Sequence, residues 1–228
     1  MRLRSRVSTI AAATAVWVAL SCTVTAQQLD RTPEDLQRAL QSRYQLIRDS
    51  TADFIQTYEG GVLRTTLVER GTFQFKKPGR MRWDYYEPER KISVWDGERI
   101  YFYLPEDRQV MVGPLSLESE ATTPALFLAG AGNFVDDFTA TFDVVQDAPQ
   151  NSYVLRLTPV RAERDFEYLT LVLDKRSLAI VRLIARDLEG GTSTFAFSNL
   201  QENQDLSDIP FRFEIPSGTD VIDTTETR

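Results

Sequence analysis

The feature that most restricts the fold of this chain is an alternation of apolar and polar residues, which starts near Phe54 and continues almost to the C-terminus. Met81 and Trp83, for example, are separated and flanked by charged residues. Since successive side chains of a β-strand point to opposite faces, this alternation predicts strands that bury one face. Turn signals such as Asp96-Gly97 separate the runs, which is typical of an antiparallel meander.

Two groups of strands are predicted, one on each side of a region with a different pattern. The meander is interrupted at Pro114, and residues 121–138 combine apolar and small residues in a pattern that predicts one or two short helices. The alternation then resumes before a closing segment at 215–222. The strands expected after the interruption are 142–145, 153–157, 166–173, 178–185 and 192–198.

One longer helix is predicted before the first strand. Thr32 suits the N-cap position, and Pro33 suits the first helical position, where an N–H has no partner within the helix. Leu36, Leu40 and other apolar residues follow at helical spacing. Residues 33–48 are therefore expected to form an amphipathic helix.

These elements predict a mainly β protein, in which about 10–11 antiparallel strands form one curved sheet or incomplete β-barrel. The apolar concave face needs cover, and the sequence offers only the N-terminal helix and the 121–138 segment. Such limited cover suggests an apolar ligand cavity, because barrels of this class can hold a small ligand. The periodicity agrees equally well with a sandwich whose interior is filled by side chains.

The N-terminus has the three-part composition of a secretory signal peptide. Three early arginines precede an apolar stretch, and Val24-Thr25-Ala26 offers a cleavage site. The stretch is short for the about 20 residues that span a bilayer, which favours removal over anchoring. We expect a signal peptide at 1–26, a single domain at 27–228 and a location in the periplasm.

Cys22 leaves an alternative open, because a lipoprotein signal ends just before a cysteine. Ser21 fits the −1 position of such a signal, but Ala19 stands at −3, where leucine is usual. Lipidation at Cys22 would make the protein membrane-anchored rather than soluble.

The composition excludes several kinds of site. The chain has no histidine, and its single cysteine lies within the expected signal peptide. Sites that depend on a catalytic histidine or cysteine are therefore excluded, as is zinc bound by these residues. We expect no catalytic residue, no metal and no cofactor. Removal of three arginines and no acid changes the net charge from −7 to −10, which argues against nucleic acid as a partner and favours a soluble monomer.

Several short motifs, taken together, resemble the LolA family of periplasmic lipoprotein carriers. They are Phe-Gln-Phe-Lys-Lys-Pro-Gly-Arg-Met-Arg-Trp-Asp-Tyr at 73–85, Val-Trp-Asp-Gly at 94–97, Ile-Tyr-Phe-Tyr-Leu-Pro at 100–105 and Phe-Arg-Phe-Glu-Ile-Pro-Ser-Gly-Thr-Asp-Val-Ile at 211–222. The resemblance covers roughly residues 34–222. It depends on the order and spacing of the motifs, since no single one is decisive.

The resemblance implies a LolA/LolB-like incomplete barrel with a helical lid over an apolar cavity. In this family the cavity takes the acyl chains of lipoproteins that an inner-membrane ABC transporter releases. The carrier then delivers them to LolB, an outer-membrane-anchored receptor of the same fold. The implied partners are acylated lipoproteins, that transporter and a LolB-type receptor.

The resemblance and the strand parity together suggest site residues. The expected lining of the lipid-binding cavity is Phe73, Phe75, Met81, Trp83, Tyr85, Ile92, Val94, Ile100 and Phe102, and the expected lid residues are Leu36, Leu40, Leu126 and Phe127. The family commonly has an arginine before the proline of a Lys-Arg-Pro motif, which bonds the lid. Here that position is Lys77, which lacks the planar fork of arginine. Lys77 and Arg80 are the candidate lid latches.

Other functions stay open at this point. A LolB-type receptor would require lipidation of Cys22. A periplasmic sensor of the RseB type has a related fold and binds lipid or misfolded envelope protein, but such sensors usually carry a second domain. Two carboxylates could hydrolyse a glycosidic bond, although no acidic pair here has a context that singles it out.

Overall fold

The computed structural model describes residues 31–60, 65–115, 132–163 and 165–224. The expected signal peptide, Cys22, Leu126 and Phe127 lie outside these residues. Within them, no helix combines the length and the apolar character that crossing a membrane requires.

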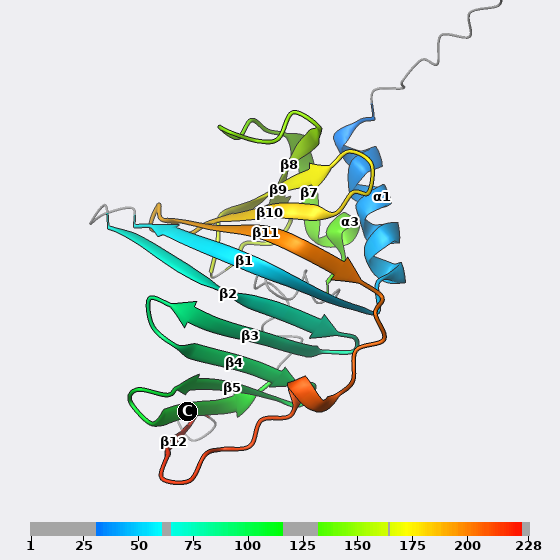
Figure 1. Cartoon of the computed structure of the whole chain (residues 1–228). Helices are drawn as coiled ribbons and strands as arrows, with labels where there is room; N and C mark the ends of the chain where they lie inside the picture. The colour runs from blue at the N-terminus through cyan, green and yellow to red at the C-terminus, as the bar shows by residue number, and fades with distance from the viewer. Residues whose placement is uncertain (1–30, 61–64, 116–131, 164, 225–228) are drawn as a thin grey trace, which may run out of the picture. The chain divides into compact units, whose positions relative to one another are not determined.

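The described residues form a sheet with a few short helices (Figure 1). The helices are α1 (Pro33–Leu46), α3 (Phe134–Asp137) and the 3-10 helix η1 (Ile209–Phe211). The strands are β1 (Asp49–Glu59), β2 (Thr66–Lys76), β3 (Arg80–Glu87), β4 (Lys91–Asp96), β5 (Arg99–Leu104), β6 (Gln109–Pro114), β7 (Phe138–Phe142), β8 (Ser152–Pro159), β9 (Tyr168–Asp174), β10 (Ile180–Arg186), β11 (Thr192–Glu202) and β12 (Asp220–Asp223).

The sheet confirms the expected fold class. Over the described residues its order is β12-β6-β5-β4-β3-β2-β1-β11-β10-β9-β8-β7, in which β7 and β12 do not pair with each other, so the barrel is incomplete. This part of the chain supplies twelve strands, one more than the largest expected number. The additional strand, β12, pairs in parallel with β6, whereas the other pairs are antiparallel. Parallel pairing is possible because the segment after β11 is long enough to cross from the middle of the sheet to the edge at β6.

Helix α1 begins where its sequence predicts. The backbone N–H of Asp35 donates to Oγ1 of Thr32 at 3.2 Å, and the backbone N–H of Thr32 donates to the Asp35 carboxylate at 3.3 Å, which forms a reciprocal capping box. Leu36, Leu40 and Tyr44 are buried on one side of the helix. The helix ends at Leu46, two residues before the expected end at 48, because the chain enters β1 at Asp49.

The sheet face that packs against α1 is called the inner face below. Antiparallel partners share a face, so the pairs Ala52–Phe73 and Phe73–Trp83 place these side chains together. The continuous buried cluster of this face also contains Leu36 and Leu40 of α1. Further strands contribute Leu155, Leu157, Leu169, Leu171 and Leu183. One buried core therefore extends over both halves of the sheet.

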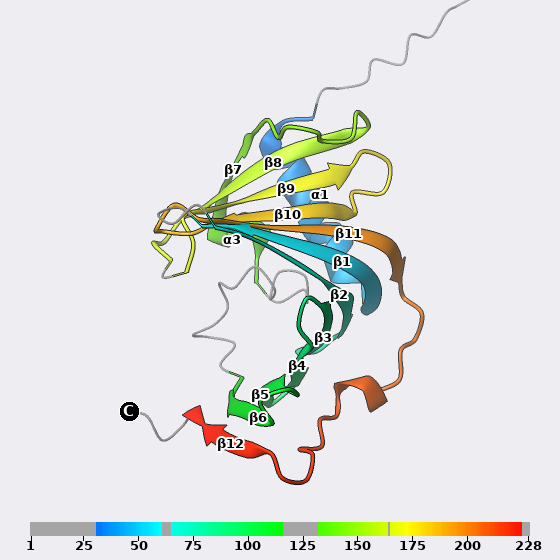
Figure 2. The same cartoon turned by 60° about the vertical axis from the view of Figure 1, so that its left-hand side comes forward.

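The outer face is buried as well over part of its area. The chain after β11 passes along the sheet through η1 and returns as β12 (Figure 2). Phe213 of this C-terminal segment packs against the rings of Tyr101 and Tyr103, with centroids 5.3 and 5.6 Å apart. Tyr101 pairs with Val94, which is fully buried. The C-terminal segment thus covers a second, smaller apolar surface.

This second surface shows that two expected cavity residues were placed on the wrong face. Ile92 and Val94 pair with Asp84 and Arg82, whose side chains alternate with the inner-face residues of β3. Both therefore face outward, and Trp95 of the same strand faces inward beside Met81. The assignment failed because it assumed that the apolar alternation of β4 marks the inner face, whereas Ile92 and Val94 lie on the outer face. The inner face of this strand carries Lys91, Ser93 and Trp95.

Candidate functional site

The inner face carries a floor of aromatic rings where β1, β2, β3 and β11 lie side by side. The ring of Trp83 lies 4.4 Å from that of Phe73, 4.9 Å from Phe54 and 5.4 Å from Phe195, measured between centroids. Phe197 completes the group at 6.0 Å from Phe73. We call these five residues the aromatic floor. Such rings offer large apolar contact areas without demanding one strict ligand geometry.

A small pocket adjoins the floor beneath the last turn of α1. Its lining is Tyr44, Ser50, Phe73, Phe75, Ile180, Phe197, Leu200 and Glu202. Its volume is about 20 Å³, which suffices for about one water molecule. Helix α1 therefore lies close against this part of the floor.

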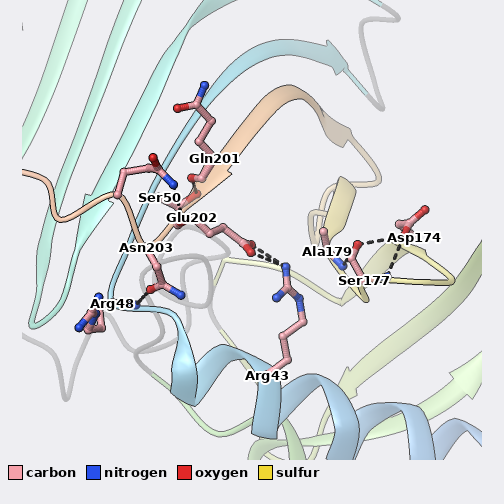
Figure 3. Close-up of polar contacts among 10 residues, drawn as sticks. Arg43, Arg48, Ser50, Asp174, Ser177, Ala179, Gln201, Glu202 and Asn203 are labelled. Atoms are coloured by element: carbon pink, nitrogen blue, oxygen red, sulfur yellow. Dashed lines mark hydrogen bonds and ion pairs between the residues drawn. The ribbon is translucent and has the colours of Figure 1, made fainter.

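The last turn of α1 is fastened to β11 by an ion pair. Nη2 of Arg43 donates to both carboxylate oxygens of Glu202, at 2.7 and 2.6 Å (Figure 3). Both side chains are about four-fifths buried, at 20% and 19% exposure. Just after the helix, the backbone N–H of Arg48 donates to the side chain of Asn203 at 2.8 Å. Polar contacts thus join the end of α1 to the chain that leaves β11.

The hairpin between β2 and β3 holds the same end of α1. Nζ of Lys77 donates to the backbone carbonyl of Tyr44, and burial lowers the pKa of the Lys77 ammonium. The adjacent Lys76 instead donates to the carboxylate of Asp208 at 2.6 Å and to the carbonyl of Leu206. The two lysines therefore hold different elements, since Lys77 contacts α1 and Lys76 contacts the C-terminal segment.

Arg80 does not contact α1 among the described residues. Its guanidinium lies 3.9 Å from the carboxylate of Asp208, beside Lys76. Arg82 likewise donates to the carbonyl of Pro210, at 3.1 Å. Arg82 also forms an ion pair with Asp84 of its own strand, at 2.6 Å. Of the basic residues of this hairpin, Lys76, Arg80 and Arg82 thus contact the C-terminal segment, and Lys77 contacts the helix.

Nearer its N-terminus, α1 is held by α3 and the start of β7. The side-chain amide of Gln37 donates to the carbonyls of Phe134 and Phe138, the latter at 2.7 Å. Oε1 of Gln41 accepts from the backbone N–H of Phe134 at 2.7 Å. Gln37 is buried, at 4% exposure, and a buried side-chain amide needs hydrogen-bond partners, which these contacts between α1 and α3 supply.

The structure brings most of the expected lining together on the inner face. The residues placed there are Phe73, Phe75, Met81, Trp83, Tyr85, Ile100 and Phe102. Phe54, Trp95, Phe195 and Phe197 belong to the same face but were not anticipated as lining. The alternation of β11 and the first strand could have identified Phe54, Phe195 and Phe197. Trp95 could not be assigned without knowing that both faces of β4 are buried.

The Arg43–Glu202 pair leads to a stability prediction. We expect Arg43→Met and Glu202→Gln each to lower the free energy of unfolding by about 1–3 kcal/mol, because each leaves a largely buried polar partner unpaired. In the double variant the loss should be smaller than the sum by about 1 kcal/mol. Urea unfolding of all four proteins measures this coupling.

A matched control is available on the same helix. The Arg38–Asp35 pair is exposed, at 61% and 49%, so Arg38→Met should change the free energy of unfolding by less than about 0.5 kcal/mol. Strictly additive losses at Arg43 and Glu202 would contradict the inferred fastening of α1 to β11.

Comparisons with known proteins agree with this architecture. The family model described as outer membrane lipoprotein carrier protein LolA matches residues 46–214. An outer-membrane lipoprotein carrier protein of Chromohalobacter salexigens is 32% identical over 212 residues, covering 92% of this chain and 95% of its own. A protein of the same name from Methylococcus capsulatus is 31% identical, with 90% and 94% covered.

A solved structure supports the fold alone. It is an uncharacterised conserved protein of Thermus thermophilus, with a TM-score of 0.52 and 12% identity, and the match covers 82% of this chain and 98% of that one. The family model, in contrast, spans most of the sequence, and the two named relatives are more than 30% identical over nearly all of it. The chain therefore belongs to the LolA family of outer membrane lipoprotein carrier proteins.

Proposed function

We propose that this chain is a non-enzymatic periplasmic carrier that binds the acyl chains of lipoproteins and conveys them toward the outer membrane. The observation that carries the proposal is the aromatic floor, a broad apolar surface. The last turn of α1 lies against one part of it and is held there by a few polar contacts. Family membership and the shared name of the relatives support the same function. The expected partners are an inner-membrane ABC transporter that releases the cargo and a LolB-type receptor that accepts it.

Helix α1 acts as the lid in this proposal. Ligand pockets typically measure about 300–1,000 Å³, whereas the pocket beneath the last turn of α1 measures about 20 Å³. We infer that acyl chains reach this part of the floor when α1 moves away from β11. That movement would break the contacts of Arg43 with Glu202 and of Lys77 with Tyr44. Lys77 is therefore the proposed latch. Leu36 and Leu40, which belong to the same buried cluster as the floor, are the proposed lid residues.

A lid that closes on its own floor also helps release. Full burial of an acyl chain with about a dozen methylenes gains ~10 kcal/mol, so three chains would gain about 30 kcal/mol. That sum exceeds the about 20 kcal/mol at which non-covalent affinity saturates. The closed state competes with the cargo for the same apolar surface, which lowers the net affinity and permits handover.

Native mass spectrometry tests the proposal directly. The protein is co-expressed with a triacylated lipoprotein, purified from the envelope without detergent and compared with a sample whose lipoprotein has its acylated cysteine changed to serine. We expect a one-to-one complex with the acylated lipoprotein only. A folded protein that forms no complex, or one that binds the serine variant equally, would contradict acyl-dependent carriage.

The same spectra distinguish the anchored receptor. The mass of the protein itself reports whether its N-terminus begins after Ala26 or at an acylated Cys22. A lipidated Cys22 would identify an anchored, LolB-like protein and would replace the soluble carrier proposed here.

A further inference from the structure

A row of polar side chains crosses the inner face at the end of the strands opposite the Lys77 hairpin. Gln56 of β1 pairs across the sheet with Glu69 of β2, and Tyr85 of β3 pairs with Lys91 of β4. Ser193 of β11 joins the row from the other side of β1. We call these five residues the polar row. It stands out on this face, whose other central positions are mostly aromatic or aliphatic, with Ser93 as an exception.

The members of the row are connected to one another. The Tyr85 hydroxyl donates to Oε1 of Gln56 at 3.0 Å, and Nε2 of Gln56 donates to Oγ of Ser193 at 3.2 Å. Nζ of Lys91 donates to the Glu69 carboxylate and lies 4.9 Å from the centroid of the Tyr85 ring. Glu69 and Lys91 are 9% and 20% exposed, so this is a largely buried ion pair.

Tyr85 joins the row to the aromatic floor. Its ring packs edge-on against Phe54 at 4.9 Å, while its hydroxyl belongs to the polar row. Trp83 precedes it by two residues, which places the two side chains on one face about 7 Å apart. Burial, followed by the nearby Glu69 carboxylate, raises the pKa of the Tyr85 phenol, so the hydroxyl stays protonated. An apolar ligand on the floor would therefore end beside protonated donors.

We propose that the polar row is a subsite for the ester and amide carbonyls that link acyl chains to the cysteine of a lipoprotein. This inference rests on the proposed function and specifies which chemical group of the cargo the protein recognises. The hydrocarbon chains lie on the aromatic floor, and the carbonyl oxygens accept hydrogen bonds from Lys91 and its neighbours.

The chemistry of the row suits carbonyl oxygens. An ammonium group has three N–H donors, and the described residues supply Lys91 with one carboxylate acceptor, Glu69. Carbonyl oxygens accept hydrogen bonds and donate none, so they complement the remaining N–H donors of Lys91. Glu69 keeps the site close to neutral, which favours an uncharged polar linkage over an anionic head group. Buried donors also reject a ligand that lacks the acceptor, because their hydrogen bonds are then lost.

The test compares two synthetic lipopeptides. One is a triacylated cysteinyl peptide with two glyceryl esters, and the other replaces both esters with ethers of equal chain length. Titration followed by tryptophan fluorescence measures both affinities, since Trp83 and Trp95 lie on the inner face. We expect the protein to bind the ester peptide roughly tenfold more tightly, because a hydrogen bond from a charged group is lost with the ether.

The variants locate that preference. In Lys91→Met combined with Glu69→Gln, no charge is left unpaired, and we expect both peptides to bind with the affinity of the ether peptide. Lys175 is the matched control, because it also lies over a tyrosine ring, 5.3 Å from Tyr153, but outside the row. Lys175→Met should keep the preference for the ester.

Each other outcome contradicts the proposal in a different way. Equal binding of ester and ether by the unmodified protein would overturn the subsite while carriage still holds, and this comparison needs no variant that must fold. A preference that survives in the double variant would also overturn it. Binding of neither peptide would overturn the proposed function and the subsite together.

Discussion

Replacing Lys77 with methionine is expected to release the last turn of α1. The variant loses the hydrogen bond from the ammonium to the Tyr44 carbonyl, which we value at about 1.5 kcal/mol, the lower end for a charged donor. The closed state should therefore lose roughly tenfold in population relative to the open state. We expect faster deuterium exchange in α1, tighter apparent binding of acylated cargo and slower transfer to an acceptor.

Two variants of the same hairpin serve as controls. Lys77→Arg keeps a donor and should retain much of the protection of α1. Lys76→Met removes a lysine whose contacts go to Asp208 and Leu206 rather than to the helix, so exchange in α1 should stay unchanged. If Lys77→Met left the exchange of α1 at the level of the unmodified protein, Lys77 would not be the latch.

Of the substitutions considered, Phe54→Ala should cause the largest loss of stability. Phe54 is 1% exposed and lies in edge-on contact with Trp83 and Tyr85, both at 4.9 Å. Its ring also lies on the backbone of Gly71, where an added Cβ would come within 2.5 Å of the ring. Removing a large, enclosed side chain typically costs about 3–5 kcal/mol. The free energy of unfolding, measured with urea, should fall by that amount.

The neighbouring Ile55 provides the comparison. It lies on the opposite face of the same strand and is 37% exposed, so Ile55→Ala should cost clearly less, about 1 kcal/mol. If Phe54→Ala were no more harmful than Ile55→Ala, the aromatic floor would not be packed in the cargo-free protein. That result would favour a cavity that stays open without ligand.

Much of the local structure was predictable because its causes are local. Thr32, Pro33 and Asp35 provide the capping contacts and fix the start of α1 whatever lies around it. The alternation around Met81 and Trp83 likewise identifies β3 and the face that it buries. The motifs also indicated the family, because their order and spacing can be read without a structure.

The candidate site was predictable only in part. The inner-face positions of Phe73 and Trp83 follow from parity, whereas Ile92 and Val94 were assigned to the wrong face. The different roles of Lys76 and Lys77 could not be read from the sequence either. These adjacent residues contact two elements, α1 and the C-terminal segment, that lie far from each other in the sequence. The polar row could not be predicted for the same reason, because its members come from five different strands.

The sequence by itself determined the mainly β class, the capped N-terminal helix, the lack of histidine chemistry and the family. These properties depend on composition or on neighbours within a few residues. Only the tertiary structure decided which face of β4 looks inward, which lysine meets α1 and which polar groups share the inner face. The physical reason is that hydrophobic alternation reports burial but not the identity of the covering element. Val94 lies on the outer face of β4, the strand that η1 of the C-terminal segment contacts, and is as completely buried as Met81 on the inner face.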